Sequence, residues 1–190
     1  MRITGGNFRG RLIEPPAGFR ARPTTDFARE GLMNILNNRY DFFEVSLLDL
    51  FGGTGAISYE FASRGTRDID IVETERRNCE FISKTIRSFG FESAKVHRLD
   101  VHDWLKICHK KYDIIFADPP YALKWLAEIP DMILSSEAVS ESTLFILEHP
   151  AAYDFSHEKF FTENRKYGNV NFSFFCLASP HVTINSATND

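Results

Sequence analysis

The segment Asp118-Pro119-Pro120-Tyr121 places a carboxylate, proline carbonyls and an aromatic ring at one point of the chain. It follows an apolar run, Tyr112 to Ala117, that predicts a buried parallel strand. Two prolines end a strand because proline has no N–H for the ladder. The carboxylate and a proline carbonyl can accept both hydrogens of an amino group while the ring stacks on a flat base. The segment therefore predicts a site for an amino group on a planar base, with a purely structural turn as the alternative.

A glycine cluster, Gly52 to Gly55, follows a second apolar run, Val45 to Leu50, and precedes a helical pattern from Ala56 to Ser63. Rossmann-like folds bind nucleotides at such a strand-to-helix turn. The spacing Gly53-x-Gly55-x-x-Ser58 is close to the dinucleotide fingerprint, with serine in the third place. A tight turn that needs positive φ has the same glycines, so this motif alone leaves both interpretations open.

Acidic residues stand at the ends of further predicted strands. Glu73 follows the strand Ile69 to Val72 and can accept hydrogen bonds from both hydroxyls of an adenosine ribose. Asp100 follows the strand Lys95 to Leu99 and can accept from an adenine amino group. Asp49 lies just before the glycine loop, where it can meet a cationic group. These acids favour an adenosine that carries positive charge, S-adenosylmethionine, over a dinucleotide, whose pyrophosphate prefers fewer acids nearby.

The elements that position these residues alternate between strands and helices, which predicts an α/β fold. We expect a Rossmann-like, doubly wound, mostly parallel seven-stranded sheet with an antiparallel C-terminal hairpin and a short N-terminal basic arm. The remaining predicted elements are a helix from Thr25 or Asp26 to about Asn37, helices at Arg76–Phe89, Trp104–Cys108 and Trp125–Leu134, a strand at Thr143–Leu147, and hairpin strands around Phe160-Phe161 and Val170–Leu177.

The composition bounds the class of protein. The chain has 190 residues, 43% of them hydrophobic and 14% aromatic, which is enough for one domain with a sizeable core. No apolar run approaches the roughly 20 residues needed to span a bilayer, and the first ten residues lack the apolar core of a secretory signal. Three widely spaced cysteines without a C-x-x-C pair indicate neither a disulfide framework nor a zinc site. We therefore expect a cytoplasmic protein that needs no membrane and no metal.

The charge is unevenly distributed along the chain. The net charge of −4 argues against a nucleic-acid partner, but residues 1–30 hold six arginines and carry +3, which leaves −7 on the remainder. Arginine forks match phosphate oxygens well, so this segment favours an arm that contacts phosphates. A solvated arm with scattered charges is the alternative.

Taken together, the motifs resemble two nested protein families. Class I S-adenosylmethionine-dependent amino-methyltransferases share the ordered motifs Asp49-x-Phe51-x-Gly53-x-Gly55, Glu73, Asp100 and Asp118-Pro119-Pro120-Tyr121. A narrower resemblance, to the RsmD-type 16S rRNA guanine-N2 methyltransferases, covers about residues 2–177. It rests on Arg9-Gly10-Arg11, Arg22-Pro23-Thr24-Thr25-Asp26, Arg29-Glu30, Asn34, Ser63-Arg64-Gly65 and Tyr167-Gly168.

The resemblance implies an enzyme that methylates the exocyclic N2 of a guanine in 16S rRNA, either as free RNA or within an assembling small subunit. The residues at the two ends predict a basic arm or hairpin over residues 1–24 and a flexible tail over 181–190, and the resemblance implies a methyltransferase domain over 25–180. The implied residues are Asp118, Pro119 and Tyr121 for catalysis, Asp49, Phe51, Gly53, Gly55, Glu73, Asp100 and Val101 for the cofactor S-adenosylmethionine, and Arg9, Arg11, Arg22 and Tyr121 for the RNA.

Two alternatives stay open from the sequence. The D-P-P-Y segment is shared with adenine-N6 methyltransferases, so methylation of adenine in DNA or RNA is the nearest rival. A nucleotide-binding module that transfers no methyl group is a rival of another class, in which the Asp118 turn is only structural.

Overall fold

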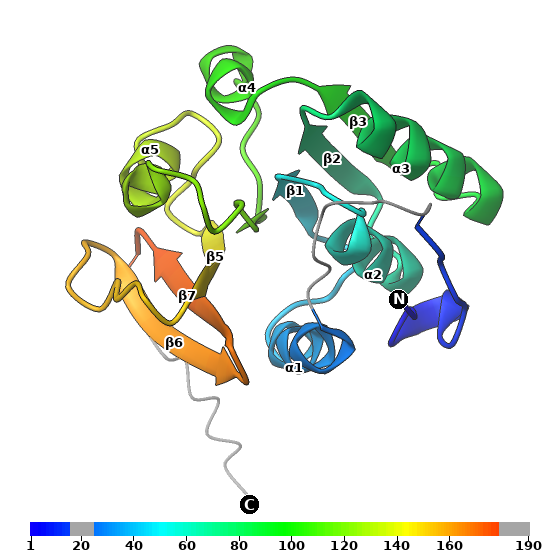
Figure 1. The fold of residues 1–190 in the computed structure, drawn as a ribbon, viewed down its shortest axis with the longest axis horizontal. Coiled ribbons are helices and arrows are strands. Elements are labelled where there is room, and N and C mark those ends of the chain that lie inside the picture. The colour runs from blue at the N-terminus through cyan, green and yellow to red at the C-terminus, as the bar shows by residue number, and fades with distance from the viewer. Residues whose placement is uncertain (16–24, 179–190) are drawn as a thin grey trace, which may run out of the picture.

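A computed structural model describes residues 1–15 and 25–178. Arg22 and the expected tail over 181–190 therefore lie outside the described residues. The described strands form one seven-stranded sheet in the order β3-β2-β1-β4-β5-β7-β6 (Figure 1). They are β1 (Ser46–Leu50), β2 (Asp68–Glu73), β3 (Ala94–Arg98), β4 (Ile114–Ala117), β5 (Leu144–Pro150), β6 (Phe161–Tyr167) and β7 (Val170–Cys176).

The helices follow the strands in the expected alternation. They are α1 (Asp26–Asn37), α2 (Ala56–Arg64), α3 (Arg76–Phe89), α4 (Val101–Ile107) and α5 (Ile129–Leu134), with short 3-10 turns η1 (Gly6–Phe8) and η2 (Leu126–Glu128). Strands β1 to β5 are parallel, and β7 runs antiparallel to both β5 and β6. The Rossmann-like fold with an antiparallel C-terminal hairpin is thus confirmed.

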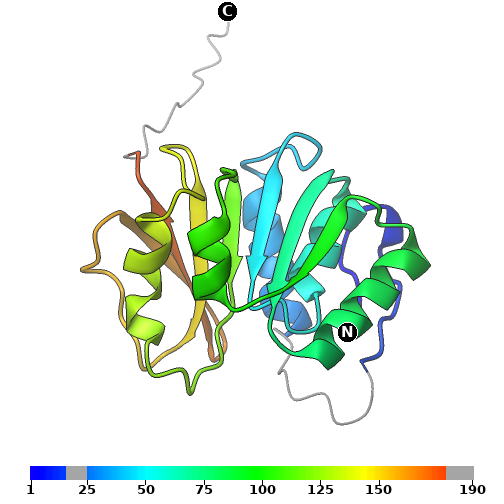
Figure 2. The ribbon, with the colours of Figure 1, turned by 90° about the horizontal axis from the view of Figure 1, so that it is seen from above.

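The sheet separates two apolar layers. Helices α1, α2 and α3 cover one face, and α4 and α5 cover the other (Figures 1 and 2). Because side chains alternate along a strand, Ile69 and Ile71 of β2 belong to the first layer. Leu48 and Leu50 of β1 belong to the second layer. A strand buried on both faces is mostly apolar, which explains the apolar runs in the sequence.

The strand order reverses at β1, which pairs with β2 on one side and with β4 on the other. In the register of β1 and β4, Leu50 lies opposite Ala117. The glycine loop and the D-P-P-Y segment therefore leave the sheet side by side. This reversal is the switch point at which open α/β sheets bind ligands.

The N-terminal residues pack onto the body of the protein. Arg2 and Leu12 form an antiparallel bridge, and Ile3 and Ile13 are buried in the layer that contains α1 and α2. Phe8 makes edge-to-face contacts with the rings of α3 and its following turn. Residues 1–15 thus share the main core, and their proposed RNA contacts have to come from exposed side chains.

One arginine of the basic segment has a structural role. The Arg29 side chain is 1% exposed and pairs with the buried carboxylate of Glu60 at 2.9 Å. Glu60 also pairs with Arg64 and accepts hydrogen bonds from the Thr4 N–H (2.8 Å) and hydroxyl (2.9 Å). The interpretation of the arginines in residues 1–30 as phosphate contacts is therefore wrong for Arg29, because its charge is neutralised inside the fold.

Local signals explain several element boundaries. The Thr25 hydroxyl accepts from the Ala28 N–H (3.2 Å) and so caps α1 at its start. Gly31 interrupts α1 in sequence, yet a Cβ there would lie 2.2 Å from the Tyr167 ring. The glycine is thus required by the packing of α1 on β6. The expected helix from Trp125 begins instead with a 3-10 turn before Pro130.

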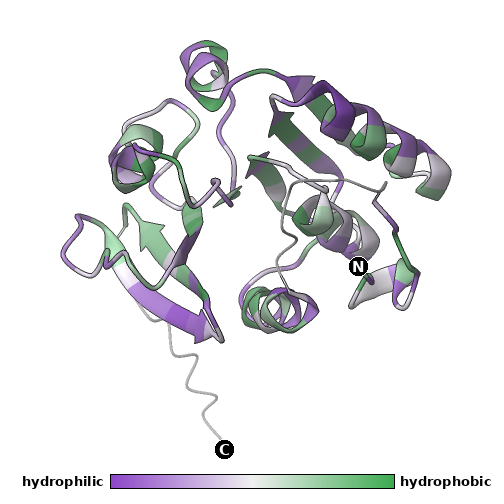
Figure 3. Ribbon diagram, viewed as in Figure 1, coloured by the Kyte–Doolittle hydropathy of each residue, from purple (hydrophilic) through white to green (hydrophobic). Residues whose placement is uncertain are grey.

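The hydropathy pattern follows burial (Figure 3). The central strands are apolar, whereas the edge strand β6 is hydrophilic and carries exposed Arg165 and Lys166. Charged side chains on an edge strand discourage pairing with other chains. Among the residues that the structure describes, no helix is both long and apolar enough to cross a membrane.

Candidate functional site

A cavity of about 640 Å³ lies at the carboxyl ends of the central strands. The glycine loop, the ends of β2, β3 and β4, and the turn between β6 and β7 contribute to its walls. The predicted site residues that line it are Phe51, Gly53, Glu73, Asp100, Val101, Asp118, Pro119 and Tyr121. Asp49 and Gly55 do not line the cavity, and Arg9 and Arg11 lie elsewhere. The expected cofactor and catalytic motifs therefore meet in one place.

The glycine loop is held by backbone bonds and by Glu73. The Gly53 N–H donates to Glu73 Oε2 (2.7 Å), and the Glu75 N–H donates to Glu73 Oε1 (2.8 Å). Gly55 has a φ of 79° and directly precedes α2, a conformation that favours glycine. Each carboxylate oxygen accepts more than one hydrogen bond, so Glu73 can hold the loop and still accept from ligand hydroxyls.

Asp49 lies behind the glycine loop and is 3% exposed. Ser58 Oγ of α2 donates to Asp49 Oδ2 at 2.5 Å. Burial raises the pKa of Asp49 to about 7, the Ser58 bond opposes that shift, and the charge of Glu73 adds to it. The serine in the third place of the glycine motif therefore orients a buried carboxyl group.

Asp118 is the first residue after β4 and faces two other acids. Burial raises the pKa of Asp118 well above its ordinary value, and the charges of Glu148 and Asp49 raise it further. Within the described residues, neither Asp49 nor Asp118 forms an ion pair with a lysine or arginine. No three His, Cys, Asp or Glu side chains of that part of the chain are grouped as metal ligands.

Glu148 is a site residue that we did not predict from the sequence. It follows Leu147 of β5, which is the register partner of Ala117, so it lies beside Asp118. Glu148 is 3% exposed and lines the cavity. A signal existed: the residue directly follows the predicted strand Thr143–Leu147, as Glu73 and Asp118 follow theirs.

Aromatic rings form one wall of the cavity. Phe51 has a φ of 62°, an unusual value for a residue with a side chain, and its ring centroid lies 6.0 Å from that of Trp125. The His102 ring packs on Trp125 at 4.3 Å, and Asp100 caps α4 by accepting from the His102 N–H (2.8 Å). This wall suits a planar heterocycle, and a strained residue is a frequent mark of a functional loop.

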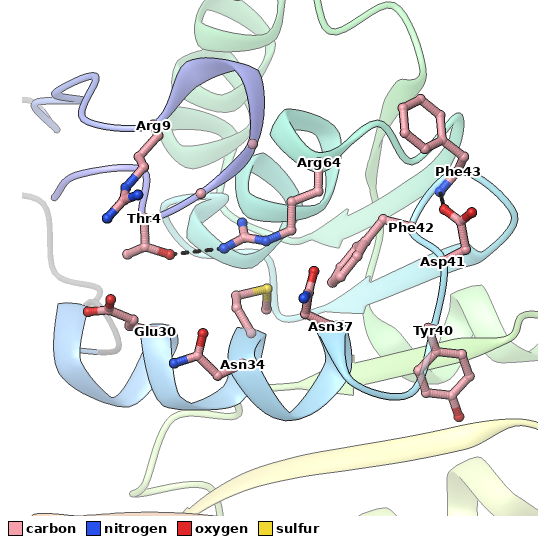
Figure 4. Close-up of a pocket in the computed structure, with 13 residues that line it drawn as sticks. Thr4, Arg9, Glu30, Asn34, Asn37, Tyr40, Asp41, Phe42, Phe43 and Arg64 are labelled. Atoms are coloured by element: carbon pink, nitrogen blue, oxygen red, sulfur yellow. Dashed lines mark hydrogen bonds between the residues drawn. The ribbon is translucent and has the colours of Figure 1, made fainter. Parts of the chain in front are cut away.

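A second pocket, of about 590 Å³, lies between the N-terminal residues and α1 (Figure 4). Arg9 and Arg64 project into it from one side, and Glu30 and Asn34 of α1 face them from the other. It lacks the strand-end acids of the main cavity. Arg11 is exposed and lines neither pocket. The structure therefore does not bring Arg9 and Arg11 to the Asp118 site.

Comparison with known proteins places the chain among methyltransferases. Residues 1–176 match the family described as Conserved hypothetical protein 95. The putative rRNA methyltransferase YlbH of Bacillus subtilis (strain 168) is 30% identical over 159 residues, covering 78% of this chain and 82% of that protein. Ribosomal RNA small subunit methyltransferase D of Escherichia coli (strain K12) is 28% identical over 148 residues, covering 78% and 74%.

A solved structure supports the same relationship. A hypothetical protein of Thermus thermophilus superimposes with a TM-score of 0.81 at 29% identity, covering 92% of this chain and 98% of that one. The family match over residues 1–176 and the relative at 30% identity agree with the motifs at the strand ends. This chain therefore belongs to the Conserved hypothetical protein 95 family, the family of the RsmD-type methyltransferases that its motifs resemble.

Proposed function

We propose that this protein transfers a methyl group from S-adenosylmethionine to the exocyclic N2 of a guanine in small-subunit rRNA. The observation that carries the proposal is the single cavity that Glu73 and the D-P-P-Y segment share across the switch point of the sheet. The names of the Escherichia coli and Bacillus subtilis relatives, both rRNA methyltransferases, support the class of substrate.

The cavity fits an adenosine that carries positive charge. Glu73 is the proposed acceptor for the ribose hydroxyls, Asp100 for the adenine amino group, and Phe51 and Val101 are the proposed apolar contacts. Gly53 and Gly55 shape the loop, and the acids Asp49 and Asp118 supply negative potential. S-adenosylmethionine, when bound, supplies an electrophilic methyl group on a positively charged sulfur.

The proposed role of Asp118 begins with the chemistry of the target amine. An exocyclic amine is a weak nucleophile because its lone pair is delocalised into the ring. Hydrogen bonds from its two hydrogens to the Asp118 carboxylate and the Pro119 carbonyl would hold the nitrogen so that the lone pair faces the methyl group. Positioning and electrostatics then contribute most of the rate. Tyr121, 37% exposed at the mouth of the cavity, is the proposed stacking partner for an extruded base.

The raised pKa of Asp118 makes it suited to accept the proton that the amine must lose. Positive charge in the cavity would lower the pKa of Asp118 and favour the carboxylate. In the transfer, the positive charge would pass from the sulfur to the amine nitrogen, which would then release a proton to the Asp118 carboxylate. The carboxyl group can then retain the proton of the methylated amine until solvent takes it, which is the sequence a general base requires.

The test is transfer of an isotope-labelled methyl group to small-subunit rRNA that lacks the modification. Two substrates show whether the enzyme acts on free rRNA or on rRNA within the small subunit. They are a protein-free transcript and small subunits isolated from cells without the enzyme. We expect N2-methylguanosine after nuclease digestion and mass spectrometry, and at least about 100-fold slower formation with Asp118→Ala. N6-methyladenosine as the product would establish the adenine alternative. Cofactor binding without incorporation into either substrate would favour the nucleotide-binding module.

A further inference from the structure

We infer that Glu148 selects the base, by accepting a hydrogen bond from the N1–H of guanine beside the amine that Asp118 holds. Glu148 would then be a specificity-determining residue that contacts the substrate. This inference rests on the proposed function, because it concerns the base whose exocyclic amine is methylated.

The first support is the register of the sheet. Strands β4 and β5 are parallel neighbours in which Ala117 lies opposite Leu147. Asp118 and Glu148 come directly after these partners, and neighbouring strands are about 4.8 Å apart. Paired positions of parallel strands direct their side chains to the same face. The two carboxylates therefore form an adjacent pair of acceptors at the edge of the sheet, and both line the cavity.

The second support is the burial of Glu148 and its electrostatic effect on Asp118. Its side chain is 3% exposed, and the Tyr121 hydroxyl donates to its Oε1 at 3.3 Å. The charge of Glu148 raises the pKa of Asp118, so the two acids repel each other. Hydrogen-bond donors stabilise carboxylates that lie this close together. The adjacent N–H groups of a ligand would add donors to the pair.

The two purines differ at the position that this pair faces. Guanine presents the N2 amine and, next to it, an N1–H donor. Adenine presents the N6 amine and, next to it, an N1 acceptor. Two adjacent acceptors on the protein match two adjacent donors on guanine, whereas the N1 lone pair of adenine would meet the Glu148 carboxylate. A site built around a hydrogen bond rejects a ligand that leaves its buried polar group unpaired.

The experiment compares two bases that both carry the C2 amine. After the methylated nucleotide has been mapped, RNA is prepared with guanine or with 2-aminopurine at that position. 2-Aminopurine keeps the amine and has an acceptor in place of the N1–H. The enzymes are the natural protein, Glu148→Gln, and the control Glu137→Gln, whose side chain is 71% exposed and pairs with His109.

We expect the natural protein and Glu137→Gln to prefer guanine by roughly 10- to 100-fold in kcat/KM. We expect Glu148→Gln to reduce that preference to about twofold or less, because an amide can offer either a donor or an acceptor. The KM for S-adenosylmethionine should be unchanged. 2-Aminopurine also lacks the C6 oxygen of guanine, and this difference is the same for every enzyme. Its effect therefore cancels when the ratio of kcat/KM for the two bases is compared between enzymes.

An unchanged preference in folded Glu148→Gln would overturn the inference. If that variant does not fold, Glu148→Asp serves instead: it keeps an acceptor on a shorter arm and should retain the preference at a reduced rate, while loss of preference with an unchanged rate would contradict the inference. Failure of the proposed function is distinguishable, because the natural protein would then methylate no guanine at all.

Discussion

Two clusters of carboxylates in this protein are built in opposite ways. Glu60, beneath the N-terminal residues, has a side chain 1% exposed and is paired with Arg29 and Arg64. Of the strand-end acids, Asp49 and Glu148 are buried and Asp118 is half-buried. Within the described residues, Asp49 and Asp118 form no ion pair with a lysine or arginine. The buried carboxylate of the first cluster is paired with arginines, whereas Asp49 and Asp118 of the second have raised pKa values.

The contrast distinguishes carboxylates that stabilise the fold from carboxylates that are suited to bind a ligand. A buried charge is tolerated when opposite charges and hydrogen bonds compensate it, and then it serves architecture. A carboxyl group that is withdrawn from water without such compensation shifts its pKa upward, as Asp49 and Asp118 do. A ligand that brings positive charge or hydrogen-bond donors stabilises the ionised form of such carboxyl groups. A site for S-adenosylmethionine and an amine requires this property.

The largest expected effect is at Asp118. Asp118→Ala should reduce methyl transfer by about 10²- to 10⁴-fold, the range typical of a lost general base and positioning group. Cofactor affinity, measured by calorimetric titration, should change little. Asp118→Asn sharpens the comparison, because it keeps an acceptor and removes the charge. Near-normal turnover of Asp118→Ala on rRNA would return the D-P-P-Y segment to a structural role.

Substitution of Glu60, the buried carboxylate of the first cluster, should lower the stability of the protein. Glu60→Ala removes the buried carboxylate that pairs with both Arg29 and Arg64, so the free energy of unfolding should fall by about 3–5 kcal/mol. Asp118→Asn removes like-charge repulsion, and the ligand-free protein should be as stable as the natural one or more so. Urea unfolding of both variants checks this. Equal destabilisation by the two substitutions would break the distinction between the clusters.

Glu73 tests the cofactor half of the cavity. Glu73→Ala should weaken S-adenosylmethionine binding by about 1.5–3 kcal/mol, the loss expected for hydrogen bonds to a charged group. Because Glu73 also holds the Gly53 N–H, Glu73→Gln is a useful companion that retains an acceptor for the loop. Unaltered affinity in folded Glu73→Ala, measured by calorimetry, would remove this residue from the site.

Asp49 predicts a pH dependence of stability. Its folded-state pKa of about 7 lies above that of the unfolded chain, so the folded state binds the proton more tightly. This contribution is fully present below about pH 4 and is lost as the pH rises to about 7. Between pH 5.5 and 8 the natural protein should lose about 2 kcal/mol more stability than Asp49→Asn. Parallel losses in denaturant titrations at both pH values would contradict the assignment.

The smallest effect concerns the exposed arginines, the counterpart of buried Arg29. Replacing Arg9 and Arg11 by glutamine should lower the slope of log affinity for RNA against log salt by about 0.7–0.9 per lost phosphate contact. Arg76→Gln is the matched control, because Arg76 is 74% exposed on α3 and pairs with Glu80. Salt titrations that show the same slope for all three proteins would make the N-terminal residues purely structural.

The sequence determined much of the local structure. The boundaries of α3 and the end of α1 agree with the expected residues, because apolar periodicity and caps act within a few residues. Glycines and prolines marked both loops at the switch point. Placing acids directly after apolar runs was enough to bring Glu73, Asp100 and Asp118 to one edge, since parallel strands share the direction of their carboxyl ends.

Only the tertiary structure decided which of these residues touch. Glu148 lies beside Asp118 because β5 pairs with β4 in one particular register. Arg29 is neutralised because α2 brings Glu60 against α1, and Arg9 belongs to a different pocket from Asp118. Pairing between distant segments depends on packing over the whole core, which a local pattern does not contain. The sequence therefore determined which functional groups stand at each strand end, and the pairing of the strands determined which of these groups lie next to one another.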